Sequence, residues 1–227
     1  MLSQPESFSI TLKGAMNPAV HHPSWYYTIG QLSKEDAASV VGSGNLCVTP
    51  DLSTFRAPLF DVASSKSKWR IKTRDKNARL RILQVALKTF DDVLPETRLR
   101  RFCFKFAFSV EAGHATTVVF LSNLMRDFVQ VKGEGEIAAT ISSTTSTDPV
   151  RRREVRLHSS PGASRALLTF SFSYPIPDER VFTLRHMSLA EDYALDYEEA
   201  VTQAEQLAYK LIDGGRRENV DTGIKGN

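Results

Sequence analysis

A regular alternation of large apolar side chains with small or polar ones near the middle of the chain constrains the fold most. In residues 102–110 every second position is apolar, and these positions are Phe102, Phe104, Phe106, Phe108 and Val110. Successive side chains of a strand point to opposite faces of a sheet, so this segment predicts a strand with one strongly apolar face. Such a face needs a covering layer, because burying apolar surface is the main driving force of folding.

The residues before this strand have the spacing of a helix that could cover it. Apolar side chains recur at helical intervals in residues 77–94, at Leu80, Leu83, Leu87, Phe90 and Leu94. Asp75 or Asn77 can cap the start of this helix, and Pro95 ends it. We predict that the helix lies on a sheet above the phenylalanine strand, with Leu87 and Phe90 in the core.

The other patterns predict more strands and two further helices. Strands are expected at residues 8–12, 46–48, 55–62, 68–73, 116–121, 129–131, 136–142, 154–159, 165–174 and 180–186. Ser33 is expected to cap a helix that ends at Gly42, and Asp196 to cap a longer helix that ends at Gly214. The predicted fold class is α+β, with mostly antiparallel sheet or sheets and two long helices, at about 77–94 and 197–213, packed on the sheet.

A chain of 227 residues can bury a sizeable core in one domain or two. We predict a single domain over residues 1–215, followed by a flexible polar tail over residues 216–227. Two similar halves, each a sheet with one long helix, remain open as an alternative, at about 1–112 and 113–215. No residue-level repeat supports a duplication.

Composition predicts a cytoplasmic protein that does not enter a membrane. The first 14 residues have no apolar segment of the kind found in secretory signals, and the apolar run at residues 117–121 is too short to span a bilayer. The two cysteines, Cys47 and Cys103, have no metal-ligand spacing. Reduced thiols in the cytosol are therefore expected.

No sequence motif identifies a catalytic centre. His21 and His22 form the one histidine pair, which would need further ligands to bind a metal, so we interpret it as a polar turn. Cys103 has no histidine nearby in sequence and is expected to be an unreactive, partly buried thiol. Glycine-rich phosphate loops and nucleophile elbows are missing from the sequence. We expect no metal and no cofactor, and we favour a non-enzymatic protein, although an enzyme whose site is assembled from dispersed residues is left open.

The charges are segregated along the chain although the formal net charge is only +3. Residues 66–105 contain 13 basic and 4 acidic side chains, whereas residues 187–213 contain 7 acidic and 1 basic. Five of the basic residues alternate along one predicted strand, and three more follow one another later in the chain. The candidate partner- or phosphate-binding residues are Lys66, Lys68, Arg70, Lys72, Arg74, Arg151, Arg152 and Arg153.

Two interpretations of this basic strand are open. Alternate residues of a strand lie roughly 6.6–6.8 Å apart, so the cations could contact successive backbone phosphates of a nucleic acid. Alternatively, they form a solvated sheet face and pair with acids on a neighbouring strand or on the C-terminal helix. The aromatic residues fall mostly on apolar faces, which argues against stacking with single-stranded bases.

The N-terminal region resembles a family of bacterial proteins of similar length. The resemblance rests on Asn17-Pro18, on the run from Pro23 to Tyr26, and on Gly30, and it extends to the order of the basic strand and the two helices. Members of that family often carry an asparagine-containing pattern where this chain has Phe104-Lys105-Phe106-Ala107. The resemblance implies an α+β fold and a bacterial cytosolic setting, and it implies no particular reaction.

We favour a non-catalytic component that binds a protein partner or a second copy of itself through its polarised charges. An antitoxin, an immunity protein or an accessory subunit of a bacterial complex would fit this description. The alternatives are a nucleic-acid-binding module that uses the strand from Lys66 to Arg74, and the enzyme mentioned above.

Overall fold

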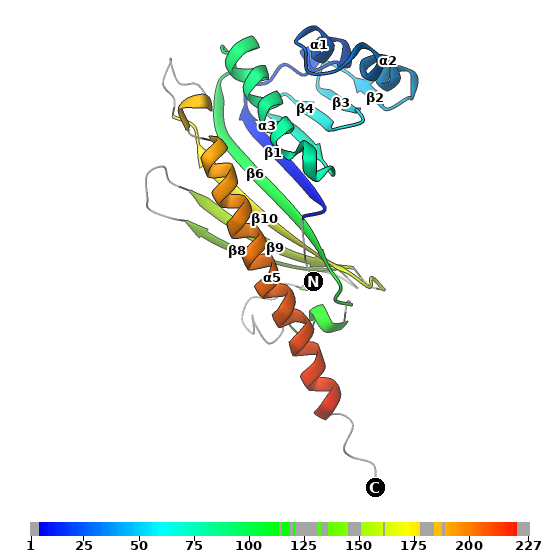
Figure 1. Ribbon diagram of the computed structural model, residues 1–227, viewed down its shortest axis with the longest axis vertical. Coiled ribbons are helices and arrows are strands. Elements are labelled where there is room, and N and C mark those ends of the chain that lie inside the picture. Colours follow the sequence, from blue (N-terminus) through cyan, green and yellow to red (C-terminus); the bar gives the residue numbers. More distant parts are fainter. Residues whose placement is uncertain are drawn as a thin grey trace.

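The computed structural model of the chain describes residues 5–113, 115–118, 120, 131–132, 136–144, 151–160, 162–177, 184–187 and 189–221 (Figure 1). Its centre is a ten-stranded sheet in which every pair of neighbouring strands is antiparallel. The strands are β1 (Ser7–Gly14), β2 (Leu46–Val48), β3 (Leu52–Arg56), β4 (Asp61–Ser65), β5 (Lys68–Thr73), β6 (Leu99–Val110), β7 (Val131–Lys132), β8 (Glu136–Thr144), β9 (Arg152–Ser159) and β10 (Ala166–Pro175). The predicted α+β class with an antiparallel sheet is confirmed.

The strand order divides the sheet into two groups with the same topology. The order is β2-β3-β4-β5-β1-β6-β10-β9-β8-β7, so β1 and β6 meet in the middle and a four-stranded meander extends from each. In both groups the central strand comes first along the chain, and a helix follows the meander. These helices are α3 (Arg79–Leu87) and α5 (Leu189–Asp221). By strand order, β6 therefore belongs with the second group.

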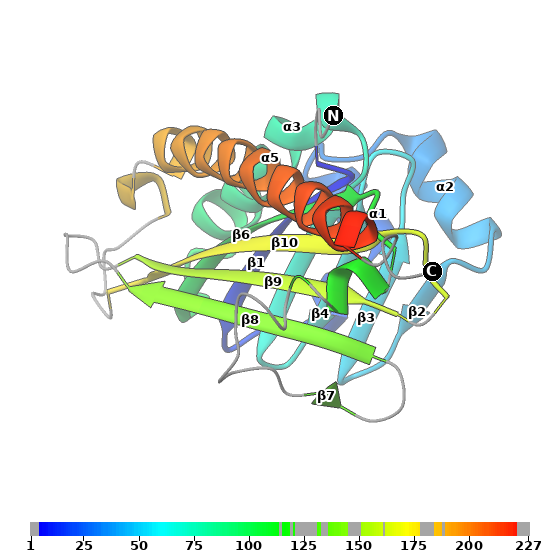
Figure 2. The ribbon, with the colours of Figure 1, turned by 90° about the horizontal axis from the view of Figure 1, so that it is seen from below.

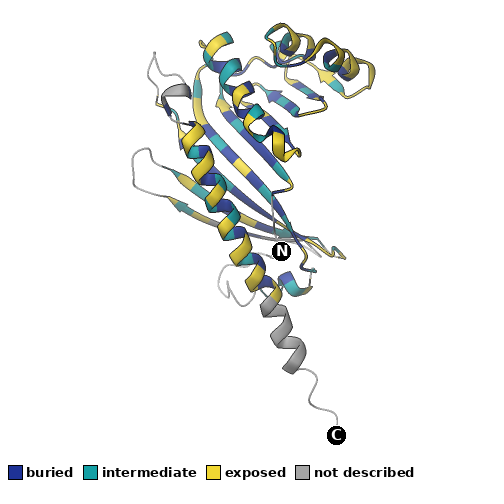
Figure 3. Ribbon diagram, in the orientation of Figure 1, coloured by how far each residue is buried: buried dark blue, intermediate teal, exposed yellow. Residues whose placement is uncertain are grey.

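The described helices α1 (Pro23–Thr28), α2 (Lys34–Gly42), α3 and α5 lie on one face of the sheet, as the view along the sheet shows (Figure 2). Buried residues alternate with exposed ones along the strands (Figure 3). The phenylalanine row of β6 faces α5, and the Tyr193 ring lies 4.8 Å from that of Phe104 and 5.5 Å from that of Phe106. The predicted apolar face is thus covered, mainly by the C-terminal helix.

Only one long helix packs on the sheet, whereas two were predicted. The segment expected to be a helix at 77–94 consists of a 3-10 turn (Lys76–Ala78), the nine-residue α3, and a π-helical turn (Lys88–Val93). The amide of Leu94 bonds to the carbonyl of Thr89, five residues earlier, at 2.9 Å, which is the hydrogen bond of a widened turn. This turn buries Phe90 as predicted, while Leu87 is only half-buried.

The C-terminal helix is longer than predicted at both ends. It begins at Leu189 and has Glu191 and Asp192 in its first turn, so Asp196 lies inside the helix and does not cap it. Asp196 is completely buried and bonded to the sheet, which explains why an acidic residue occupies a helix interior. The helix continues past Gly214 to Asp221, so the first residues of the predicted tail are helical, and residues 222–227 lie outside the described residues.

Three predicted strands differ in the structure. The predicted strand 55–62 is divided by a turn, so that its ends belong to β3 and β4. Residues 116–118 of the predicted strand 116–121 are helical, because both the amide and the hydroxyl of Thr117 donate to the carbonyl of Gly113 at 3.0 Å. Leu184–Met187 forms a 3-10 turn at the end of the predicted strand 180–186, whose first part lies outside the described residues. By contrast, α2 begins after Ser33 as predicted, and the Ser33 hydroxyl accepts from the amide of Asp36 at 3.0 Å.

Gly14 lies at an irregularity in the pairing of β1 with β6, where a side chain has no room. A Cβ atom at this position would collide with the carbonyl oxygen of Arg98, which is backbone and cannot rotate away. We expect Gly14→Ala to lower the free energy of unfolding by about 1–3 kcal/mol, as overpacking does. Urea denaturation measures this, with Gly42→Ala as the control, because a Cβ at Gly42 meets nothing within 4 Å. Equal stabilities of the two variants would contradict the packing at Gly14.

Candidate functional site

The sheet face opposite α1, α2, α3 and α5, called the open face here, carries a concentration of basic side chains. The register of β1 with β5 and β6 pairs Ser9 with Lys72 on one side and with Lys105 on the other, and pairs Thr11 with Arg70. Residues directly opposite in antiparallel strands project from the same face. We define the basic platform as Lys68, Arg70, Lys72 and Lys105, grouped around Ser9 and Thr11.

An acid lies directly across from one cation of the basic platform, because Asp61 on β4 is paired in register with Lys72. None of the four forms an ion pair with the described part of the chain, although other basic residues nearby do: Arg56 lies 3.3 Å from Asp61, and Arg156 contacts Glu154. Burial, together with the charges of Arg74 and Arg70, lowers the pKa of Lys72, against the opposing effect of Asp61. Burial, then the charge of Arg156, also lowers the pKa of Lys105. The positive charges of the platform therefore repel one another, and none of them is neutralised by an ion pair within the described residues.

A shallow hollow of about 560 Å³ lies over the basic platform. Its floor is made of short side chains, namely Ser7, Ser9, Thr11, Ala107 and Thr169. Its sides are formed by the four platform residues and Arg74, and among the described residues that line it Glu6 is the single acid. A floor of hydroxyl groups between long cationic side chains offers hydrogen-bond donors and positive charge to the same ligand.

The structure brings together some of the predicted site residues and separates the others. Lys68, Arg70 and Lys72 project from β5 onto the open face, and the exposed Arg74 follows them at the edge of the hollow. Lys66 precedes β5 and pairs with Asp51. On β9, Arg152 lies opposite Ser173, so it projects from the open face, two strands away from Lys105 on β6.

Arg151 and Arg153 face the helices instead. The guanidinium of Arg151 lies 2.6 Å from Asp196 and 2.5 Å from Glu199, and that of Arg153 lies 2.7 Å from Glu199. Tyr174 donates to the second carboxylate oxygen of Asp196 at 2.8 Å. Burial raises the pKa of Asp196 to about 7, against the opposing effects of Tyr174 and Arg151. This cluster attaches α5 to the sheet and is separate from the basic platform.

Sequence reasoning missed Ser9, Thr11 and Lys105 as members of the site. The alternation of β6 places Lys105 opposite the phenylalanine row, which the sequence did predict. The sequence does not show which strands lie next to each other in the sheet. β1 lies between β5 and β6, and this order alone brings Lys72 and Lys105 to the two sides of Ser9.

The histidine pair is structural. His21 is buried, and its Nδ1 lies 3.1 Å from the hydroxyl of Tyr26, which also accepts from the indole of Trp69 at 2.9 Å. His22 caps α1 by accepting from the amide of Ser24 at 3.2 Å. The described residues contain no group of three or more side chains suited to hold a metal ion.

Both cysteines are free thiols, Cys47 exposed and Cys103 half-buried. Burial raises the pKa of Cys103 to about 11, so its thiolate is scarce at neutral pH.

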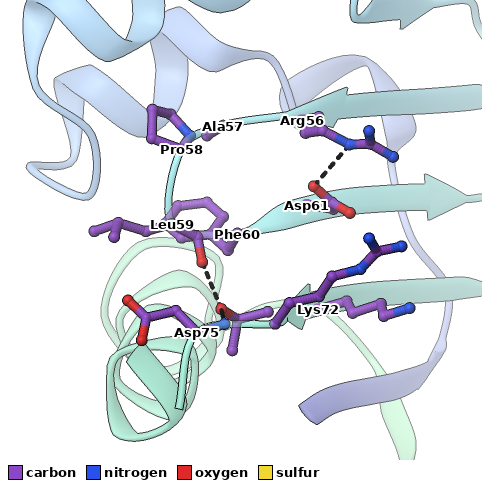
Figure 4. A pocket seen from close by; sticks show the side chains of 10 residues that line it. Arg56, Ala57, Pro58, Leu59, Phe60, Asp61, Lys72 and Asp75 are labelled. Atoms are coloured by element: carbon purple, nitrogen blue, oxygen red, sulfur yellow. Dashed lines mark hydrogen bonds and ion pairs between the residues drawn. The ribbon is translucent and has the colours of Figure 1, made fainter. Parts of the chain in front are cut away.

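A smaller pocket of about 180 Å³ adjoins the basic platform at the turn between β3 and β4 (Figure 4). It contains the ion pair of Arg56 with Asp61, and the hydroxyl of Thr73 donates to the carbonyl of Leu59 at 2.7 Å. Its polar groups are thus largely satisfied internally, and the basic platform remains the stronger candidate site.

Comparison of the chain with models of protein families and with curated protein sequences finds no match in either. Among the described residues, the structure contains no helix that is both long and apolar enough to cross a membrane. The function must therefore be argued from the open face itself.

Proposed function

We propose that the protein is a non-catalytic binding component whose basic platform holds an acidic surface of a protein partner. The observation that carries this proposal is the group of four cations that form no ion pair with the described residues, on a sheet face that α1, α2, α3 and α5 leave free. An acidic surface would relieve the mutual repulsion of these cations and would steer association over a long range. An accessory, immunity or antitoxin-like subunit of a bacterial complex is the role that we infer for such a component.

Two features favour a protein over a nucleic acid as the partner. The described residues that line the hollow include no aromatic side chain, so stacking with single-stranded bases has no support. In addition, acids adjoin the platform on the open face itself: Asp61 lies opposite Lys72, and Glu6 lines the hollow. These acids would repel a long polyanion that extended beyond the platform, whereas a partner protein can match positive and negative regions separately.

The test is a triple charge reversal of the basic platform, Lys68→Glu, Arg70→Glu and Lys72→Glu. In affinity capture from cells that produce the protein, followed by quantitative mass spectrometry, the specific partner should be lost. The matched control reverses three exposed cations away from the open face, Lys76→Glu, Arg98→Glu and Arg100→Glu, and should keep the partner. With the purified partner, the association rate of the platform variant should fall at least about tenfold, with a weaker dependence on salt.

The same variants decide between protein and nucleic acid. Fluorescence anisotropy with duplex DNA and single-stranded RNA should show no micromolar affinity of the wild type at about 0.15 M salt. If the wild type showed salt-sensitive binding that only the platform variant lost, the partner would be a nucleic acid and not a protein. Retention of the captured partner by the platform variant would refute the proposal, provided that thermal unfolding shows both variants to be folded.

A further inference from the structure

Ser9 lies at the centre of a cationic site in which the positions of the surrounding basic side chains are defined by the strand register. Its two cross-strand neighbours are Lys72 and Lys105, and Arg70 lies one row further along β5, opposite Thr11. Ser9 itself is only 8% exposed, because the flanking side chains and the floor of the hollow enclose it. A ligand above Ser9 would therefore meet a hydroxyl group beneath it and an ammonium group on either side.

The site is too large for a single small oxyanion. Lys72 and Lys105 are separated by two strand spacings, roughly 9–10 Å between backbones, and Lys68 lies four residues from Lys72, about 13 Å along β5. The hollow of about 560 Å³ falls in the range typical of sites for small organic molecules. Its ligand accordingly has anionic groups at more than one point.

The charge in the hollow also selects the kind of anion. In the described part of the chain, five basic side chains and one carboxylate line it: Lys68, Arg70, Lys72, Arg74, Lys105 and Glu6. A single carboxylate would leave most of this positive charge unbalanced. A phosphoryl group carries close to two negative charges at neutral pH and offers three acceptor oxygens, which suit lysine and arginine donors.

We propose that the hollow over Ser9 binds a small molecule that carries two or more phosphoryl groups. Lys72 and Lys105 hold one phosphoryl group from either side, the hydroxyl of Ser9 donates to it from below, and Arg70 and Lys68 hold the next. The ligand is recognised by its phosphoryl groups, since the described lining of the hollow offers no aromatic ring to stack with a base. This inference goes beyond the proposed protein partner and does not depend on it. Because the two would use the same cations, the ligand would compete with the partner.

Isothermal titration calorimetry on the purified chain tests the site, with pyrophosphate and tripolyphosphate as probes and orthophosphate and sulfate as comparisons at constant ionic strength. The wild type should bind one pyrophosphate or tripolyphosphate at least about tenfold more tightly than orthophosphate. Lys72→Gln and Lys105→Gln should each weaken this binding about 10- to 100-fold, as the loss of a charge-assisted hydrogen bond does. Ser9→Ala should weaken it by about 2- to 10-fold.

The control is Arg152→Gln, which removes one exposed cation from the open face outside the hollow and should leave the affinity unchanged. An equal loss with Arg152→Gln would show a diffuse electrostatic effect and would overturn the proposed site. Absence of saturable binding, or equal affinities for pyrophosphate, orthophosphate and sulfate, would overturn it as well. These measurements use no protein partner, so their failure leaves the partner proposal standing, and the capture experiment can fail independently.

Discussion

Replacing Phe106 by alanine should lower the free energy of unfolding by about 3–5 kcal/mol, the range found for buried aromatic truncations. Phe106 is 0% exposed and lies on β6, one of the two central strands that join the two groups of the sheet. Its ring contacts aromatic rings on both neighbouring strands and on α5, with centroid distances of 6.1 Å to Phe8, 6.0 Å to Phe172 and 5.5 Å to Tyr193. The substitution would therefore leave a cavity where the two groups of strands and the covering helix α5 meet. This cavity cannot close unless both groups and the helix move.

Chemical denaturation with a linear extrapolation measures this loss. The control is Leu80→Ala, because Leu80 is an apolar residue of α3 with 52% of its surface exposed. That substitution should change stability by no more than about 0.5 kcal/mol, as surface changes usually do. If Phe106→Ala cost no more than Leu80→Ala, the position of α5 over the sheet would be wrong.

The buried His21 should make the protein sensitive to acid. Nδ1 of His21 lies 3.1 Å from the hydroxyl of Tyr26, which also accepts from Trp69, and the imidazole ring is buried among these groups. Burial lowers the pKa of His21 from 6.5 to about 4. Its stabilising contribution is present in full above pH 6.5, and it is lost as the pH falls towards 4, because the unfolded chain then binds a proton that the folded chain does not. A shift of this size corresponds to roughly 3 kcal/mol.

The free energy of unfolding, measured by urea denaturation between pH 7.5 and pH 4, should show this loss, with His21→Gln for comparison. The glutamine variant is expected to be less stable at pH 7.5, since it disturbs a packed cluster, but the His21 part of the pH dependence should vanish. The difference between the two pH profiles isolates His21 from the carboxylates that also titrate in this range. Parallel profiles for the two proteins would contradict the buried neutral histidine.

Local patterns in the sequence predicted the faces of the strands well, and there is a physical reason. The side chains of a strand alternate between two faces whatever its neighbours are, so the row from Phe102 to Val110 had to be buried on one side. The same alternation put Lys68, Arg70 and Lys72 on the opposite side of β5 from Trp69 and Ile71. A cap such as Ser33 depends only on residues within one turn, and its prediction was confirmed for the same reason.

Long-range pairing decided the features that sequence patterns could not. Asp196 was predicted to cap a helix because it precedes an apolar periodic segment, but its partners Arg151 and Tyr174 come from other parts of the chain. The same contacts took Arg151 and Arg153 out of the predicted basic surface. The length of α5 likewise reflects packing along the sheet, since helix stability in proteins comes largely from tertiary contacts.

The sequence by itself determined which side chains share a face of a strand, where the basic residues are concentrated and which helical stripes are apolar, because each of these depends on residues close together in the chain. Only the tertiary structure decided that β1 lies between β5 and β6, and so that Lys72 and Lys105 stand on either side of Ser9. The hydrogen bonds that join strands are made by the backbone and are nearly the same for every pair of residues. The order of strands is therefore selected by how the whole apolar face packs beneath its helices, and no local segment contains that information.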